Sequence, residues 1–243
     1  MKKQITPILS VVIAAFNEQD NIKELTTRID KTLKSNNIQY ELVYVIAGTD
    51  NTVKIVQEFQ KTLPIKIIYS PQPGGLGNDF KKGFAAVSPS SKYVLTMDAD
   101  LNHSPEEIPL FMKCMETDQP DIIIGSRYIK KAKLLNMPLW KRFVSKLANI
   151  TFSIMLGTSI KDKTSGYRLY KQKILQNIAS SFKSRNFEFV IEMLMIALKN
   201  KYKIQEIPIT FNYRIYGKSK MNLFKTAKGY AKLLLYRNKI QIK

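Results

Sequence analysis

Two aspartates follow directly on a hydrophobic run in the segment YVLTMDADLNHSPEEIP, residues 93–109. Negative charge concentrated at the end of a strand is unfavourable unless a cation lies beside it. In extended backbone, residues i and i+2 project to the same side, so Asp98 and Asp100 can face one point, and Asn102 continues the series with a neutral oxygen. Hard divalent cations bind such oxygen ligands and leave other positions to water and phosphate, so the segment predicts an Mg²⁺ or Mn²⁺ site. The alternative is that both aspartates are ordinary turn residues.

The residues after the aspartates carry a helix-start signal. Ser104, Pro105 and Glu107 have the form of a capping box, in which Ser104 is the N-cap and Glu107 reaches back to it. This pattern predicts a helix over residues 105–115 that fixes the loop carrying the carboxylates. His103 is interpreted as a hydrogen-bonding residue of that loop rather than as a metal ligand or a base.

Three further segments place polar groups or glycines after predicted strands. The run IAAFN leads into Glu18, and GSRY places Arg127, whose guanidinium could bind a phosphate through two parallel hydrogen bonds. In isolation, Arg127 could equally form a surface salt bridge. The segment GGLGN, residues 74–78, opens a predicted helix where glycines would let a ligand approach free backbone N–H groups. Ligands of open α/β sheets bind outside the carboxyl ends of the strands, so these segments are expected to border one site.

Strands and helices alternate through the first half of the chain. Short apolar runs over residues 8–16, 41–47, 65–70, 93–97 and 121–125 are predicted strands, and stretches with helical spacing follow the first four. Continuous apolar runs are typical of a parallel sheet that helices bury on both faces. The chain is therefore predicted to have an α/β fold with a mostly parallel central sheet.

The second half departs from this alternation. Helices are predicted over residues 138–156 and 187–198, and a short strand over 166–170. The alternation in residues 203–214 predicts an antiparallel strand pair, and residues 223–236 predict a basic amphipathic helix. A chain of 243 residues suits one α/β domain. We expect residues 1–220 to form that domain and residues 221–243 to be its C-terminal basic helix.

The chain is strongly basic, with 39 Lys and Arg against 19 Asp and Glu and a formal net charge of +20. Residues 127–146 and 214–243 contain no acidic side chain. Such a field attracts nucleic acid, anionic lipid or phosphorylated substrates. Nucleic acid is disfavoured, because the carboxylates of the predicted site would repel phosphate without a metal. Cys114 is the single cysteine, which excludes an intrachain disulfide, and is interpreted as a small core residue.

Taken together, the motifs resemble glycosyltransferase family 2 enzymes, most closely the dolichyl-phosphate (polyprenyl-phosphate) mannosyltransferase group. The likeness is carried in family order by VVIAAFNE, GLGNDFKKGF, MDADLNHSPEEIP, GSRY, DKTSGYRLY, FEFVIEML and IQEIPITFNYRIYGKSKMNL. It implies a GT-A fold, a Rossmann-like, mostly parallel sheet flanked by helices, with C-terminal antiparallel strands and amphipathic helices. It also implies an inverting, metal-dependent transfer of a hexosyl group, with mannose favoured, from a nucleotide-diphosphate sugar to a polyprenyl or dolichyl phosphate.

The resemblance also implies roles for individual residues. On the donor side these are Ala14, Phe16, Glu18, Gly75, Asp98, Ala99, Asp100, Arg127, Arg214 and Lys220. The metal ligands would be Asp98, Asp100 and Asn102, and the catalytic groups Asp98, Asp100 and Arg127. On the acceptor side the matching residues are Asp162, Ser165, Gly166, Arg168 and Glu192.

The chemistry of the acceptor supports a phosphate independently. A hydroxyl nucleophile needs a positioned base, and TSGYR replaces the Glu-Asp pair that hydroxyl-using relatives commonly carry before the acceptor helix. A phosphate monoester, with a second pKa of about 6, is already largely ionised at neutral pH. It needs to be held by cations, and the two acid-free basic stretches supply them.

Two departures from the family pattern concern the nucleotide. Ile46 and Ala47 stand where relatives usually carry acidic residues, although Asp50 is retained, and Ala14 replaces a usual proline. We therefore expect a nucleotide-sugar donor, with GDP-mannose favoured and a UDP-sugar as the alternative. Two other functions stay open, namely transfer to a saccharide hydroxyl, and a degenerate transferase that binds its donor without turnover.

Membrane contact is expected to be peripheral. No apolar run reaches the roughly 18 residues of a spanning helix, and the N-terminal run is too short for a signal peptide. The basic helix over residues 223–236 is expected to lie on an anionic membrane surface, with the helix over 138–156 as second candidate. The alternative is that both helices pack on the domain. We expect a cytoplasmic protein attached to the cytoplasmic face of a membrane, directly or through an anchoring partner subunit.

Overall fold

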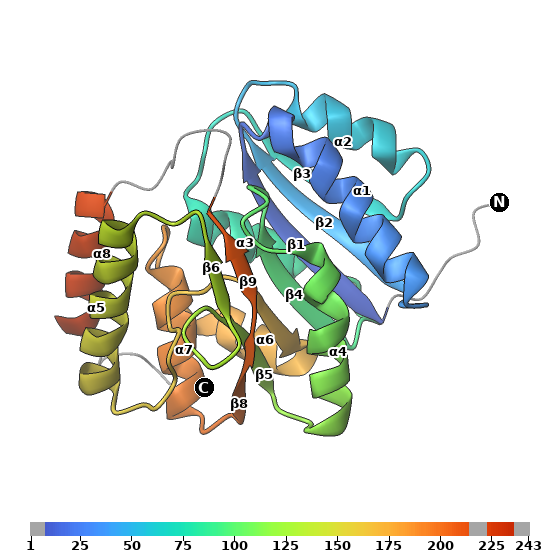
Figure 1. Ribbon diagram of the computed structural model, residues 1–243. Helices are drawn as coiled ribbons and strands as arrows, with labels where there is room; N and C mark the ends of the chain where they lie inside the picture. Colours follow the sequence, from blue (N-terminus) through green and yellow to red (C-terminus); the bar gives the residue numbers. More distant parts are fainter. Residues whose placement is uncertain (1–7, 214–222, 236–243) are drawn as a thin grey trace.

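The computed structural model describes residues 8–213 and 223–235. Its centre is a seven-stranded sheet in the order β3-β2-β1-β4-β7-β5-β8 (Figure 1). The strands are β1 (Leu9–Phe16), β2 (Tyr40–Ala47), β3 (Ile65–Ser70), β4 (Tyr93–Asp98), β5 (Ile122–Ser126), β7 (Arg168–Lys171) and β8 (Ile204–Pro208). β1 pairs in parallel with β2 and β4, and β5 with β8, whereas β7 runs antiparallel between β4 and β5. The predicted mostly parallel sheet is confirmed, with one antiparallel strand inserted in it.

Helices cover both faces of this sheet (Figure 1). One face is covered by α1 (Gln19–Ser35), α2 (Thr52–Gln60) and α4 (Ile108–Thr117), the last preceded by a 3-10 turn, η1 (Pro105–Glu107). The other face is covered by α3 (Leu76–Ala86), α6 (Gln172–Ser181) and α7 (Phe189–Lys199). The helices expected in these regions are confirmed, except that α6 has no counterpart in the prediction.

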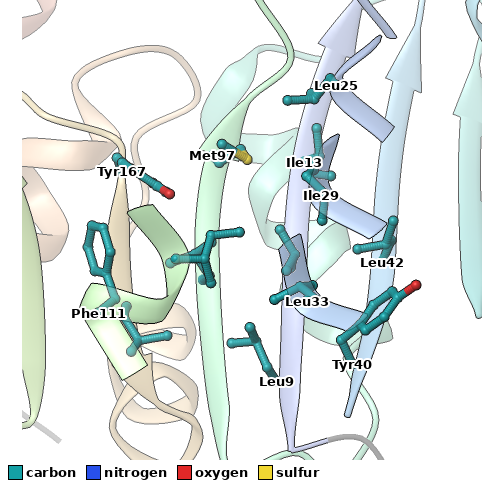
Figure 2. Close-up of a cluster of buried hydrophobic side chains, with 14 of the residues drawn as sticks. Leu9, Ile13, Leu25, Ile29, Leu33, Tyr40, Leu42, Met97, Phe111 and Tyr167 are labelled. Atoms are coloured by element: carbon teal, nitrogen blue, oxygen red, sulfur yellow. The ribbon is translucent and has the colours of Figure 1, made fainter. Parts of the chain in front are cut away.

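The two-sided burial explains why the strands are apolar at nearly every position. Val11 and Ile13 of β1 point into the core cluster that contains Phe111, whereas Val12 between them points into the cluster that contains Phe80. Figure 2 shows the first cluster, with Ile13 beside α1 and Phe111 beside Tyr167. A strand that packs helices on both faces cannot alternate apolar and polar residues.

Two helices stand side by side at one end of the molecule, at the left of Figure 1, namely α5 (Leu139–Leu156) and α8 (Leu223–Leu235). A small separate cluster joins them to α7, through Phe152 of α5, Ile191 and Met195 of α7, and Leu233 of α8. The rings of Phe152 and Tyr230 meet edge to face, with centroids 5.1 Å apart. The helices predicted for these two regions are confirmed, and both contact the domain.

The prediction for residues 203–214 is wrong in its pairing. β8 pairs in parallel with β5, and β9 (Thr210–Asn212) pairs in parallel with β6 (Lys133–Leu135) in a separate two-stranded sheet. Alternation of apolar and polar residues indicates an extended, half-buried segment, but it does not identify the strand with which that segment pairs. Here both partners come from distant parts of the chain.

A buried carboxylate joins β1, β2 and the loop before β4. Glu41 is 5% exposed, and it accepts hydrogen bonds from Ser10 Oγ at 2.6 Å, Ser88 N at 2.6 Å and Ser88 Oγ at 2.7 Å. Lys66 Nζ lies 2.9 Å from Glu41 Oε2. Burial raises the pKa of Glu41, but the hydrogen bonds from Ser10 and Ser88 and the Lys66 ammonium outweigh it, so the pKa lies below its ordinary value. The carboxylate is therefore ionised at neutral pH.

Replacement of this carboxylate is expected to change how stability depends on pH. Above the ordinary pKa of a glutamate, the ionised Glu41 stabilises the fold, and this stabilisation is lost as pH falls through its lowered folded-state pKa. Glu41→Gln should cost about 1–3 kcal/mol at pH 7 and show a shallower loss of stability in acid. Urea unfolding at pH 7 and in acid measures both effects, with the exposed Glu58→Gln as control. Equal pH dependence in wild type and Glu41→Gln would contradict this role.

Candidate active site

The order of the strands reverses its direction between β1 and β4. β1 leads through α1 to β2 on one side, whereas β4 lies on its other side. In open α/β sheets such a reversal leaves a crevice outside the carboxyl ends of the strands, where ligands bind. Ala14 of β1 lies opposite Asp98, the last residue of β4. The fold therefore brings these two predicted donor-side residues together.

The loop after β4 turns sharply instead of continuing in an extended form. Leu101 has a φ of 59°, in the left-handed region. The turn brings Asn102 back onto Asp100, so that Asn102 N donates to Asp100 Oδ1 at 3.2 Å and Asn102 Nδ2 donates to Asp100 Oδ2 at 2.8 Å. Aspartate commonly accepts from a backbone N–H two residues further on, which closes such a turn. The expectation of one extended series from Asp98 to Asn102 is therefore wrong, although the turn still gathers Asp100 and Asn102.

Asn102 presents an oxygen that suits a cation. Its side chain is 8% exposed and its amide nitrogen binds Asp100, which leaves Oδ1 buried with no hydrogen-bond partner among the described residues. Such atoms are uncommon in folded proteins and indicate a ligand, water or ion. Within residues 8–213 and 223–235, no three Asp, Glu, His or Cys side chains form a metal site. The oxygens of Asp98, Asp100 and Asn102 are the donor types that Mg²⁺ and Mn²⁺ prefer, with the amide as third donor.

Asp98 also meets the segment predicted to lie beside the acceptor. A methyl group added at Gly166 would lie 3.8 Å from Asp98 Oδ2. Thr96 Oγ1 donates to Gly166 O at 2.6 Å, which fixes this approach from within β4. The loop over residues 160–166 therefore borders the candidate metal site.

Helix α1 holds the far end of the segment over residues 98–107, which carries the candidate metal ligands and is named the metal loop. Arg28 Nε donates to Glu106 Oε1 at 2.9 Å, and Arg28 Nη2 donates to Glu106 Oε2 at 2.8 Å. The capping-box prediction is wrong in its partners, because Ser104 Oγ donates to Glu106 rather than capping the helix. Glu107 instead accepts a hydrogen bond from Thr210 N of β9 at 2.7 Å. For Glu107, a distant partner has replaced the local one that the pattern implied.

His103 packs as an aromatic ring within this loop. It stacks on Tyr167, with centroids 4.9 Å apart, and meets the edge of Phe211 at 5.5 Å. Burial lowers the pKa of His103 to about 3, and the positive charge of Arg127 acts in the same direction, so the ring is neutral. Its Nδ1 is buried and has no partner among the described residues. The interpretation of His103 as a hydrogen-bonding residue of the loop is therefore not supported at Nδ1.

The loops after β1 and β2 are tied together by side chains. Asp50 Oδ2 accepts from Gln19 N at 3.1 Å, and Thr52 Oγ1 accepts from Glu18 N at 2.8 Å. Asn17 Oδ1 accepts from Thr49 N at 3.0 Å. Asp50, retained from the family pattern without a role in the sequence analysis, thus positions the loop that carries Glu18.

The predicted nucleotide-side residues occupy this rim. Phe16 is 37% exposed at the end of β1, whereas Glu18 is buried and accepts a hydrogen bond from Asn21 Nδ2 at 2.7 Å. Ile46 and Ala47 are buried inside the sheet at the end of β2. The strand that would carry the family's acidic residues therefore ends in apolar side chains.

Two N–H groups of the glycine-rich segment before α3 are used within the chain, so the expected free N–H groups are not found at Gly77 and Asn78. Gly77 N donates to Arg185 O at 2.8 Å, and Asn78 N donates to the same oxygen at 3.4 Å. A methyl group at Gly75, whose φ is 96°, would come 2.5 Å from Arg185 O, and one at Gly77 would come 2.4 Å from Ser184 O. The glycines make room for the chain's own residues 184–185.

Glu192 fixes the same segment from α7. Its carboxylate is buried and accepts from Lys183 N at 3.0 Å and from Ser184 N at 2.7 Å. These contacts give a structural reason for the glutamate, whose role could not be derived from sequence. Glu192 reaches the start of α3 through residues 183–185.

Arg127 and Asp162 form a buried ion pair at the carboxyl end of β5. Arg127 Nε donates to Asp162 Oδ2 at 2.7 Å, Nη2 donates to Oδ1 at 2.7 Å, and the backbone N of Arg127 donates to Oδ2 at 2.9 Å. The side chains are 10% and 0% exposed. Burial opposes both charges, but their mutual attraction outweighs it, raising the pKa of Arg127 and lowering that of Asp162. Two residues assigned to opposite sides of the reaction therefore form one ionised unit.

Arg168 is directed at backbone rather than at the crevice. Its side chain is 2% exposed, and it donates to the carbonyl oxygens of Lys163 at 2.6 Å, Ser165 at 2.8 Å and Val190 at 2.9 Å. It therefore shapes the loop over residues 160–166 from behind. Arg214 and Lys220, the other predicted basic contacts, lie outside the described residues.

The comparison with known families decides the classification of this chain. The family described as Glycosyl transferase family 2 matches residues 10–179, which include the metal loop and Arg127. The chain belongs to this family. The resemblance identified from the motifs is thereby confirmed.

Curated members of the family with related sequences carry consistent names. The chain is 35% identical over 217 residues to a dolichol-phosphate mannosyltransferase of Pyrococcus furiosus, covering 88% of this chain and 59% of that protein. It is 31% identical over 217 residues to a polyprenol monophosphomannose synthase of Mycolicibacterium smegmatis, covering 87% of this chain and 80% of that protein. The chain thus spans less than two thirds of the length of the Pyrococcus protein.

Solved structures confirm the expected GT-A fold. A crystal structure of glucosyl-3-phosphoglycerate synthase from Mycobacterium tuberculosis with Mn²⁺, UDP and phosphoglyceric acid matches at a TM-score of 0.70 and 16% identity, covering 98% of this chain and 80% of that one. A structure of the same protein with Mn²⁺, UDP-glucose and phosphoglyceric acid matches at a TM-score of 0.71 and 18% identity, covering 97% and 81%. In the described part of the chain, none of the helices combines the length and the apolar character needed to cross a bilayer.

Proposed function

We propose that this chain transfers a mannosyl group, with inversion, from a nucleotide-diphosphate sugar to a polyprenyl phosphate at a membrane surface. The names of the two curated relatives support the sugar and the acceptor class. The state of Asp162 carries the proposal. It is the only acidic residue of the loop over residues 160–166, and it is buried against Arg127 with a lowered pKa. A hydroxyl acceptor would need a base at this loop, whereas an ionised phosphate needs none.

Because the acceptor phosphate is already ionised, the sugar transfer needs no base to remove a proton from the acceptor. An oxygen of the acceptor phosphate forms a bond to the anomeric carbon, while the bond from that carbon to the donor diphosphate breaks and its electron pair leaves with the nucleoside diphosphate. In this proposal Asp98, Asp100 and Asn102 hold Mg²⁺ or Mn²⁺ against the donor. A bound divalent cation would supply positive charge to the departing diphosphate. The Mn²⁺ and UDP bound in the Mycobacterium tuberculosis structures support a divalent cation here.

The reaction itself provides the first test. Purified chain should transfer labelled mannose from GDP-mannose to a polyprenyl phosphate in the presence of Mn²⁺ or Mg²⁺, and a chelator should stop the transfer. UDP-glucose and UDP-N-acetylglucosamine serve as competing donors, and oligosaccharides as competing acceptors. Transfer to an oligosaccharide in place of the lipid phosphate would overturn the acceptor assignment. Thermal stabilisation by donor and metal without transfer to either would identify a degenerate transferase.

Helix α5 supports the membrane part of the proposal more strongly than α8 does. Its exposed apolar side chains are Leu139, Trp140, Phe143, Val144, Leu147, Ile150 and Ile154. At about 100° per residue, they fall within an arc of roughly 140° on one side of the helix. Such a patch marks an interaction surface, and the basic, acid-free residues 127–146 include the first part of α5. An anionic lipid surface fits both properties.

Helix α8 would add charge to the same surface. Lys228 and Lys232 are exposed on it, beside α5, and Leu235 is 84% exposed. The packing of Leu233 and Tyr230 against Phe152 supports placing residues 221–243 with residues 1–220 in one domain. The anionic cytoplasmic leaflet is the surface that this positive charge would favour, with or without an anchoring partner subunit.

Loss of the apolar face of α5 is expected to weaken lipid binding. The double variant Phe143→Ser with Ile154→Ser should lower affinity for anionic vesicles about 10²- to 10⁴-fold, because each side chain loses roughly 1.5–3 kcal/mol of apolar burial. Trp140 is the only tryptophan and is 56% exposed on this face, so a blue shift of its fluorescence reports insertion. Leu110→Ser, at an exposed position of α4, is the matched control. Undiminished vesicle binding by the double variant would place the membrane contact elsewhere.

A further inference from the structure

Helix α5 exposes an apolar face and buries a polar residue, unlike an ordinary surface helix. Its outer face is apolar, and of its 18 residues only Asn149 and Phe152 are buried. Its inner side is mixed. Ala148, Phe152 and Leu156 pack in the small apolar cluster, while Ser145 Oγ lies 2.7 Å from Tyr128 Oη and Arg142 Nη2 donates to Leu134 O at 3.1 Å. Hydrogen bonds and a small apolar cluster therefore hold the helix on the domain. An element with few buried apolar contacts opens more readily than the core does.

Asn149 connects this helix to the loop over residues 160–166. It is 3% exposed, and its Oδ1 accepts a hydrogen bond from Lys163 N at 2.7 Å. Its Nδ2 donates to Ser145 O within the helix at 2.9 Å and to Thr164 Oγ1 at 3.3 Å. A buried amide that is bonded in this way fixes the loop relative to the helix.

Thr164 continues the connection to the ion pair. Its Oγ1 accepts from Arg127 Nη2 at 2.7 Å and donates to Asp162 Oδ1 at 3.3 Å. The start of the loop is fixed separately by Glu206 of β8, which accepts from Lys161 N at 2.8 Å and from Asp162 N at 2.9 Å. Arg168 holds the carbonyl oxygens of Lys163 and Ser165. The groups of the loop that contact α5 are therefore the N–H of Lys163 and the hydroxyl of Thr164.

We propose that Asn149 is a positioning residue that couples contact between α5 and a lipid surface to the placement of Arg127, through Thr164. Lipid that contacts the outer face of α5 and the exposed lysines of α8 together binds the seated helix more tightly than a displaced one, and so favours the seated position. The bonds from Asn149 to the loop then form more fully, and the guanidinium is held at the carboxyl end of β5. The inference rests on the proposed function in one respect, because it assumes that Arg127 takes part in sugar transfer to a lipid phosphate. Transfer would then be most efficient where that acceptor resides.

Hydrogen exchange tests the coupling without any substrate. In the full-length chain, vesicles containing phosphatidylglycerol should slow exchange of the Lys163 amide about tenfold. Asn149→Ala should abolish this slowing while flotation still shows vesicle binding. Asn177→Ala, an exposed asparagine of α6, is the matched control and should behave as wild type. Binding of wild type to vesicles with unchanged exchange at Lys163 would overturn the proposal.

A kinetic test examines the same coupling at the site. With a short, water-soluble polyprenyl phosphate as acceptor, vesicles should raise kcat/KM of wild type about tenfold. Thr164→Ser, which keeps the hydroxyl, should keep this stimulation, and Thr164→Val should lose it. This pair also decides the matter if Asn149→Ala fails to fold. If vesicles stimulate Thr164→Val as fully as wild type, the coupling is overturned. If wild type transfers no sugar at all, the proposed function is refuted, and hydrogen exchange alone then tests the coupling.

Discussion

Asp100→Asn is expected to lower kcat/KM for sugar transfer about 10³-fold. Both carboxylate oxygens of Asp100 accept from Asn102. The amide of Asp100→Asn removes the charge but keeps the acceptor for Asn102 N, and its new NH2 group can donate to Asn102 Oδ1 if the Asn102 amide turns over. A divalent cation needs that charge, because its preferred ligands are carboxylate oxygens. Stabilisation of a leaving diphosphate by a bound cation is worth several kcal/mol, and about 4 kcal/mol corresponds to 10³-fold in rate.

Two measurements separate loss of the metal from loss of the fold. Thermal unfolding without ligand should be similar in wild type and Asp100→Asn, while the rise in melting temperature on adding Mn²⁺ and nucleotide should vanish in the variant. Glu116→Gln, which removes an exposed carboxylate from α4, controls for the change in net charge. Metal-dependent transfer by Asp100→Asn at the wild-type rate would remove the basis for the proposed site.

The core of the fold could be predicted because its signal is local. Val11, Val12 and Ile13 are all apolar since β1 is covered on both faces, and that continuous pattern is visible in any short window of sequence. The position of the carboxylates follows in the same way. Asp98 is the last residue of a strand that is recognisable by its composition, so its place at the carboxyl edge needed no knowledge of distant contacts.

The parts that could not be predicted depend on partners far away in the chain. The Glu107 carboxylate accepts from Thr210 N rather than from the backbone N–H of Ser104, as a capping box would require. The glycine pattern around Gly77 predicts an opening for a ligand, but Arg185 fills it. Local patterns state which groups are available for bonding, while the tertiary structure decides which groups reach them.

The polarity of α5 shows a different limit of sequence reasoning. Helical spacing separates its apolar residues from its polar ones correctly, but it does not state which face is turned inward. The usual assumption buries the apolar face, and this would place Asn149 in water and Phe143 in the core. The structure does the opposite, with Asn149 at 3% exposed and Phe143 at 68% exposed. The exposed apolar face bears on function, because a patch of this kind marks an interaction site.

Asp162→Asn is expected to destabilise the fold more than Glu41→Gln or any substitution at an exposed position. The variant leaves Arg127 buried without its counter-charge, and removal of one partner from a buried ion pair costs roughly 3–5 kcal/mol. Because the pKa of Asp162 is lowered in the folded state, its stabilisation is present above the ordinary pKa of an aspartate and is lost as pH falls through the lowered value. The variant should therefore be much less stable than wild type at pH 7 and should approach it in strong acid.

Urea unfolding over a range of pH measures the difference in stability between wild type and Asp162→Asn. Two further variants serve as comparisons. Glu58→Gln breaks the exposed pair with Lys61, whose side chains are 70% and 67% exposed, and should change stability by about 1 kcal/mol or less. The double variant Arg127→Met with Asp162→Leu should recover much of the loss, because it leaves no unpaired buried charge. Recovery of stability without recovery of sugar transfer would show that the pair is retained for the position of its guanidinium rather than for the fold. A single Asp162→Asn variant as stable as wild type would instead mean that Arg127 reaches solvent or another partner when Asp162 is neutral.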